Sequence, residues 1–154
     1  MIRLEKYTET YLDKSWEWLN DPEIKFLTNT PDFTLEEQSE WFAKIQKWDS
    51  YKIWGVSYDE IPVGVFGIKN IDLEQKSGEY WGYIGNKEYW GKGIGKAVME
   101  QLIEIAQYDL KIQKLYLKVI KENYVAISLY KKFGFRELDN DGKNIIMVKN
   151  IISL

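Results

Sequence analysis

Three strand-like segments follow one another between residues 51 and 84, with no helical pattern among them, and this run limits the folds open to the chain. Residues 51–58 and 63–71, separated at Ile61-Pro62, are predicted to form a hairpin. Residues 79–84, Glu-Tyr-Trp-Gly-Tyr-Ile, form the third predicted strand. A purely parallel, doubly wound sheet needs a helix between successive strands, so the run indicates a mixed sheet with helices packed on it.

Helical and strand patterns alternate on either side of this run. Thr8 is a predicted N-cap for a helix that ends near Asp21-Pro22, and Thr34 with Glu37 forms a predicted capping box before a second helix. The other predicted elements are strands at 2–6, 115–119, 135–138 and 144–149, and helices at 94–105 and 123–133. No linker or repeat divides the chain, so we expect a single domain over residues 1–154.

The chain contains neither cysteine nor histidine. Their absence removes disulfides, thiolate nucleophiles, serine–histidine triads and Cys/His metal sites. Proton transfer must then rely on Asp, Glu, Lys, Tyr, water or a chain terminus. The sequence shows no close-set Asp group of the kind that binds metals, so we expect no metal cofactor.

The net charge is −3, from 24 acidic and 21 basic residues. Nucleic-acid-binding proteins usually carry a strong basic excess, so no nucleic-acid partner is expected. The sequence has no signal-peptide pattern, no long apolar span and no lipidation motif. We therefore expect a cytoplasmic protein without a membrane partner.

The segment Trp90-Gly91-Lys92-Gly93-Ile94-Gly95-Lys96 places three alternating glycines and two lysines between the third predicted strand and the next helix. Glycine permits close backbone approach, and a helix start offers unpaired N–H groups at the positive end of its dipole. Such a loop suits a phosphate or pyrophosphate group.

Two common phosphate-binding patterns do not match this loop. A Walker A loop requires glycine where Trp90 stands and Ser or Thr where Ala97 stands. The dinucleotide fingerprint requires glycine where Lys96 or Val98 stands. A glycine-rich turn without any ligand stays open as the alternative.

The loop resembles the pyrophosphate motif of the GNAT superfamily of N-acetyltransferases, Gln/Arg-x-x-Gly-x-Gly/Ala, with Trp in the first position. A second segment, Asn123-x-x-Ala126-Ile127-x-Leu129-Tyr130-x-x-x-Gly134-Phe135, is similar to the family's Asn-x-x-Ala-x-x-Leu-Tyr-x-x-x-Gly-Phe signature. The form Tyr-Trp-Gly-Lys-Gly at 89–93 resembles the branch of ribosomal-protein alpha-amino acetyltransferases and nucleotide-amino-sugar acetyltransferases. The resemblance is strongest over residues 79–135.

The resemblance implies an α/β (α+β) GNAT fold, with a mixed, mostly antiparallel sheet of about six or seven strands and about four flanking helices. It also implies acetyl-CoA as co-substrate. The pantetheine arm is expected to pair with Tyr83 and Ile84, while Asn123 bonds the pantetheine or caps its own helix. The CoA pyrophosphate is expected on the backbone amides of Lys92, Gly93, Ile94, Gly95 and Lys96.

Without cysteine, the chemistry implied is direct attack by an amine on the thioester within a ternary complex, with N–H donors near Ile84 stabilising the oxyanion. Tyr130 is the candidate acid, because a thiol pKa of about 8.5 and a tyrosine pKa of about 10 allow proton donation to the thiolate. Glu79 is the candidate base, acting through water. The alternatives are a core aromatic at Tyr130 and an exposed strand-end carboxylate at Glu79.

Two comparisons within the family bear on the acceptor. Residues 18–23 and 33–42, which include Trp41, resemble segments of the branch that acetylates amino sugars on nucleotide carriers. Alpha-amino acetyltransferases that modify a ribosomal protein carry a Glu where Lys118 stands. We therefore favour a small amino sugar, free or nucleotide-linked, as the amine acceptor. A protein N-terminus and a non-catalytic acyl-CoA sensor are the alternatives, and a homodimer is left open.

Overall fold

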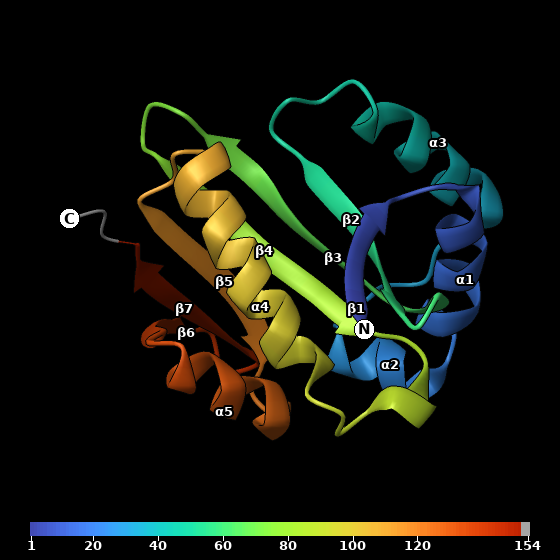
Figure 1. Ribbon diagram of the computed structural model, residues 1–154. Helices are drawn as coiled ribbons and strands as arrows, with labels where there is room; N and C mark the ends of the chain where they lie inside the picture. Colours follow the sequence, from blue (N-terminus) through green and yellow to red (C-terminus); the bar gives the residue numbers. More distant parts are fainter. Residues whose placement is uncertain (152–154) are drawn as a thin grey trace.

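The computed structural model describes residues 1–151, which form a seven-stranded sheet with five α-helices around it (Figure 1). The strands are β1 (Ile2–Lys6), β2 (Lys52–Tyr58), β3 (Ile61–Asp72), β4 (Ser77–Ile84), β5 (Lys114–Ile120), β6 (Arg136–Asn140) and β7 (Asn144–Asn150). The helices are α1 (Glu9–Leu19), α2 (Pro22–Leu27), α3 (Leu35–Ile45), α4 (Ile94–Glu104) and α5 (Tyr124–Lys132). The expected fold class is confirmed, with five helices in the described residues rather than about four.

Two short turns complete the helical segments, a 3-10 turn at Lys87–Tyr89 and a π-helical turn at Ile105–Asp109. The helix predicted at 94–105 ends at Glu104 instead, because the π-helical turn begins at Ile105. Across residues 1–151, no helix has both the length and the apolar character needed to cross a membrane.

The strand order is β1-β2-β3-β4-β5-β7-β6, and only the β4–β5 pair is parallel. That parallel ladder joins Ser77–Glu79 to Lys114–Tyr116 and extends no further within the described residues. Beyond it β4 and β5 diverge (Figure 1), so the edge of β4 from Tyr80 to Ile84 has no neighbouring strand. The centre of the sheet therefore contains a wedge.

The two faces of the sheet carry separate apolar clusters, because successive side chains of a strand point to opposite faces. Tyr80 packs with Val98 of α4 in the larger cluster, on the face that α4 and α5 cover (Figure 1). Its neighbour Trp81 packs with Trp18 of α1 in the smaller cluster. The wedge is thus open to two faces of the sheet with different apolar clusters. We call them the α4/α5 face and the α1/α3 face.

Two local predictions are corrected by the structure. Asp21-Pro22 ends α1 but also begins α2, because an Asp21 oxygen accepts the backbone N–H of Glu23 at 2.9 Å and Pro22 suits the first helical position. The turn between β2 and β3 lies at Asp59 and Glu60, whose φ angles are +47° and +71°. Ile61-Pro62 is therefore inside β3, directly before a bulge at Val63 of the same strand, a position that accommodates proline.

The predicted caps are largely as expected. Thr34 and Glu37 form both hydrogen bonds of the capping box at the start of α3. Asn123 caps α5, and Gly134 follows that helix with a φ of +89°. Thr8 occupies the N-cap position of α1 without a side-chain hydrogen bond. The capping bonds of Thr34 and Asn123 thus set where α3 and α5 begin.

Candidate active site

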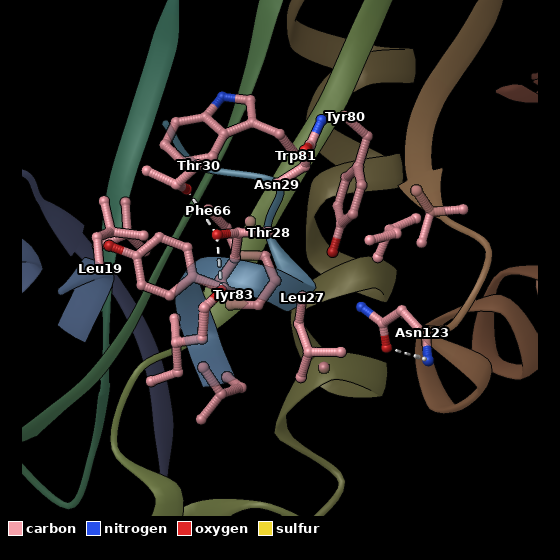
Figure 2. A pocket seen from close by; sticks show the side chains of 18 of the residues that line it. Leu19, Leu27, Thr28, Asn29, Thr30, Phe66, Tyr80, Trp81, Tyr83 and Asn123 are labelled. Atoms are coloured by element: carbon pink, nitrogen blue, oxygen red, sulfur yellow. Dashed lines mark hydrogen bonds between the residues drawn. The ribbon is translucent and has the colours of Figure 1, made fainter. Parts of the chain in front are cut away.

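The wedge opens into a cleft of about 1590 Å³ whose lining comes from both faces of the sheet. Tyr80 and Tyr130 line it on the α4/α5 face, and Tyr7, Trp41 and Trp81 line it on the α1/α3 face. In Figure 2 the Tyr80 ring lies on the side of β4 that faces Asn123, while the Trp81 and Tyr83 rings lie on the opposite side. The cleft is large enough for two ligands that meet between β4 and β5.

The glycine loop forms one end of the cleft. Gly91 and Gly93 have φ angles of +76° and +77°, and a Cβ on either would meet no atom within 4 Å. Both positions need glycine for their backbone conformation, because a residue with a side chain is strained in the left-handed region. Gly93 is the N-cap of α4, and its carbonyl accepts the Ala97 N–H at 3.2 Å. The N–H groups before Ala97 have no acceptor inside the helix and suit an anion.

The free edge of β4 forms the middle of the cleft. The backbone N–H of Gly85 donates to Val63 on β3 at 2.8 Å. Because backbone groups alternate along a strand, those of Gly82 and Ile84 point away from β3 and into the wedge. Those of Tyr83 point toward β3, and its side chain lies on the α1/α3 face. An extended ligand can pair with such an edge as an added strand.

Tyr130 approaches the wedge from α5. Its ring meets that of Tyr80 edge to face, with centroids 6.0 Å apart, and lies 5.9 Å from that of Phe135. Burial raises the pKa of Tyr130 from 10.0 to about 12. The hydroxyl is therefore neutral near pH 7 and able to donate a hydrogen bond or a proton.

Glu79 lies at the closed end of the wedge, as the last β4 residue paired with β5. One carboxylate oxygen accepts from Asn70 Nδ2 at 3.0 Å, and the other lies 3.8 Å from Lys69 Nζ. Only 16% of the side chain is exposed, so Glu79 is not a freely solvated strand-end carboxylate. The structure thus brings Glu79 and Tyr130 to one cleft from different elements.

Aromatic rings surround the part of the cleft on the α1/α3 face, which we call the acceptor half. Trp41 meets Tyr7 and Tyr51 edge to face, each at 6.1 Å, and Tyr51 lies 6.0 Å from Trp81. The Trp81 ring lies over Gly67 of β3, where a Cβ would come within 2.7 Å of Nε1. The sequence singled out Trp41 but missed Tyr51 and Trp81, although the alternation of aromatic residues in β4 was visible.

The carboxylates of the acceptor half already have partners. Glu37 is used in the capping box of α3, and Glu79 bonds Asn70. Glu23 and Asp21 both lie 2.9 Å from Lys87 Nζ, and the hydrogen bond from Lys87 holds the pKa of Asp21 below its ordinary value. Among residues 1–151, no group of three or more His, Cys, Asp or Glu side chains could hold a metal ion.

Of the remaining predicted site residues, Asn123 and Lys96 border the cleft, whereas Lys92 does not line it. Asn123 Oδ1 accepts the Ala126 N–H at 3.4 Å, so its carbonyl caps α5 while the residue lines the cleft. Lys96 lines the cleft from the start of α4. Lys118 of β5 also lines it, which places an ammonium group at the wall opposite β4.

Comparison with known proteins agrees with this geometry. The chain matches the model of the acetyltransferase (GNAT) family over residues 12–135. The protein belongs to the acetyltransferase (GNAT) family. As a GNAT protein of this kind, it is an acetyl-CoA-dependent N-acetyltransferase.

Two curated acetyltransferases are similar in sequence to this GNAT protein. It is 31% identical to acetyltransferase PseH of Campylobacter jejuni over 144 residues, 92% of this chain and 88% of that one. It is 34% identical to spermine/spermidine N(1)-acetyltransferase of Bacillus subtilis over 109 residues, 66% of this chain and 71% of that one.

Solved structures of GNAT proteins superpose on nearly the whole chain. Campylobacter jejuni PseH in complex with acetyl coenzyme A matches with a TM-score of 0.76 at 25% identity, over 97% of this chain and 99% of that one. Spermidine N-acetyltransferase from Vibrio cholerae in complex with CoA and spermine matches with a TM-score of 0.87 at 20% identity, over 97% and 95%. The second match shows a shared fold.

Proposed function

We propose that this GNAT acetyltransferase transfers the acetyl group of acetyl-CoA to the primary amine of a small amino sugar, free or nucleotide-linked. The observation that carries the proposal is the acceptor half of the cleft, where neutral aromatic rings form the walls and the carboxylates already have partners. Flat apolar walls with a few polar groups suit a sugar ring or a nucleotide base.

In the proposed complex, acetyl-CoA occupies the α4/α5 side of the cleft. The N–H groups of residues 92–96 hold the pyrophosphate, supported by the left-handed backbone at Gly93 and the unpaired amides of the first helical turn. The pantetheine arm extends along the free edge of β4 beside Gly82 and Ile84, and Asn123 contacts it from α5. The residues present therefore fit this co-substrate, because Gly82, Ile84, Asn123 and residues 93–96 all line the cleft.

The proposed chemistry is a single acyl transfer. The amine nitrogen attacks the thioester carbon, a C–N bond forms, and the C–S bond breaks. Tyr130 stays protonated at neutral pH and donates first a hydrogen bond and then its proton to the departing sulfur. Its raised pKa makes the proton transfer more uphill than for an ordinary tyrosine, so the hydrogen bond carries more of the role. The proton of the attacking amine leaves through water to Glu79. Backbone N–H groups on the free edge near Ile84 stabilise the oxyanion as it forms.

A polyamine is a second candidate acceptor, favoured by the names of the Bacillus subtilis and Vibrio cholerae proteins. A polycation that binds in a cleft loses its hydration water, and several free carboxylates are needed to compensate for that loss. Glu23 and Glu79 each have a cationic neighbour in this chain, Lys87 and Lys69 respectively. These two pairs reduce the negative charge that Glu23 and Glu79 offer to a polyamine.

A protein N-terminus is the remaining alternative within the reaction class. Alpha-amino acetyltransferases of ribosomal proteins have a glutamate at the position that Lys118 occupies in this chain. Lys118 lines the cleft. An ammonium group at this wall repels the protonated amine of a peptide and attracts an anionic acceptor such as a nucleotide-linked sugar. Lys118 thus weighs against the N-terminal acceptor.

The test is an acceptor panel with the purified protein and acetyl-CoA. Free thiol release is measured with glucosamine, a uridine-diphosphate-linked 4-amino sugar, spermidine and a peptide with a free N-terminus, and the product mass is determined. We expect the highest kcat/KM with one of the two amino sugars. A higher kcat/KM with spermidine or the peptide would contradict the proposed acceptor but leave acetyl transfer intact.

A further inference from the structure

We propose that Trp90 is a positioning residue that sets where the CoA arm meets β4, by holding the carbonyl of Ile84 and closing the free edge at that point. The inference rests on the CoA site proposed above. The indole Nε1 donates to the Ile84 carbonyl at 2.9 Å. This carbonyl is one of the backbone groups that point into the wedge, so Trp90 occupies an acceptor that a ligand would otherwise use.

The position of the indole is fixed from its other face as well. Lys87 Nζ lies 5.8 Å from the centroid of the Trp90 ring, within the range of a cation–π contact. The same Nζ lies 2.9 Å from a carboxylate oxygen of Asp21 and 2.9 Å from one of Glu23. These residues begin α2, so the contacts connect the glycine loop to a helix whose Ile24 lines the acceptor half.

The contact has a direct consequence for an extended ligand. With the Ile84 carbonyl bonded to Trp90, the groups that a ligand can still use at this end of the edge include the N–H of Ile84 and both backbone groups of Gly82. A ligand arm running down from the loop is therefore kept from any register that uses the Ile84 carbonyl. Trp90 also lines the cleft and is 37% exposed, so the arm passes its ring where the strand ends and the loop begins.

The experiment compares two acetyl thioesters in the Trp90→Phe variant. Phenylalanine keeps an aromatic ring beside Lys87 but loses the N–H donor. Acetyl-CoA extends from the β4 edge past Trp90 to the loop, whereas S-acetyl-N-acetylcysteamine lacks the part of the arm that passes Trp90. We expect kcat/KM for acetyl-CoA to fall about five- to tenfold, mainly through KM, as for the loss of one hydrogen bond, with no change for the short thioester. Trp48→Phe is the matched control, since Trp48 is exposed outside the cleft.

Three other results would contradict this proposal or the CoA site on which it rests. An equal loss with both thioesters would show that Trp90 only supports the fold and would overturn the proposal. Unchanged kinetics with both thioesters would overturn it too. Equal kcat/KM for the two thioesters in the wild-type protein would instead refute the proposed CoA site, because the loop would then contribute nothing to binding.

Discussion

The rings of Tyr80 on β4 and Tyr130 on α5 meet edge to face across the open side of the wedge, with centroids 6.0 Å apart and planes at 78°. This contact joins α5 to the strand edge and restricts the Tyr130 ring. Tyr80 is buried, and burial raises the pKa of both phenols above 10.0. The pair therefore places a neutral hydroxyl donor beside the edge on which the thioester is proposed to lie.

Removing the Tyr130 hydroxyl tests its role as the acid. Tyr130→Phe keeps the ring contact with Tyr80 but cannot protonate the leaving sulfur, so kcat should fall about 100-fold, within the range for general acid catalysis. The dissociation constant for acetyl-CoA, measured by calorimetry, should change less than about threefold, because the contact forms mainly in the transition state. Tyr108→Phe, an exposed position outside the cleft, is the control. Wild-type kcat in Tyr130→Phe would eliminate the acid role.

Glu79→Gln tests the proposed base. Glutamine retains an oxygen that can accept from Asn70 but cannot take up a proton, so kcat/KM should fall about 100-fold at pH 7. The defect should shrink as the pH rises, because solvent then deprotonates the amine. Glu74→Gln, in the exposed turn after β3, is the control. A pH–rate profile with the same loss at every pH from 7 to 10 would assign Glu79 to positioning instead.

Gly93→Ala separates backbone strain from ligand binding. Alanine at a φ of +77° should cost about 1–2 kcal/mol of unfolding free energy and shift the amides of the loop, weakening acetyl-CoA binding about tenfold or more. Gly142→Ala is a matched control, because its φ is +89° and its Cβ also meets open space. Urea unfolding should show similar losses in both variants, and calorimetry should show weaker binding only in Gly93→Ala. Weaker binding in both variants would mean that binding follows general stability.

Buried tyrosines predict a loss of stability at alkaline pH. Burial, partly opposed by a hydrogen bond with Ser15, raises the pKa of Tyr7 from 10.0 to about 12, and its side chain is only 5% exposed. Between these pH values the folded state keeps the proton that the unfolded chain loses. The contribution of Tyr7 is therefore constant below pH 10 and then falls by about 1.4 kcal/mol per pH unit.

The measurement is urea unfolding followed by tryptophan fluorescence at pH 8 to 11, for the wild type and Tyr7→Phe. The wild type should lose stability faster above pH 10, because the variant lacks this titrating group. Buried Tyr80 adds to the decline in both proteins, since burial raises its pKa as well. Parallel curves for the two proteins above pH 10 would show that Tyr7 titrates normally in the folded state.

Local sequence patterns determined much of the fold. The apolar spacing from Ile94 to Leu102, the Thr34 capping box and the glycine after α5 specify helices through contacts within a few residues, so they were readable without the tertiary structure. The short helix α2 was missed because Asp21-Pro22 signals the end of one helix and the start of the next equally well. The alternating glycines likewise marked the loop before α4, where Gly91 and Gly93 have a left-handed backbone.

The tertiary structure alone decided how the site is assembled. The short β4–β5 ladder, which ends at Glu79, is a pairing between strands about 30 residues apart, and no local pattern specifies where it stops. That divergence frees the Ile84 edge and brings Tyr130 beside it. The ion pair between Glu23 of α2 and Lys87 also depends on such packing. The sequence thus determined the elements and the reaction class, whereas long-range packing decided which groups are left free to meet the substrates.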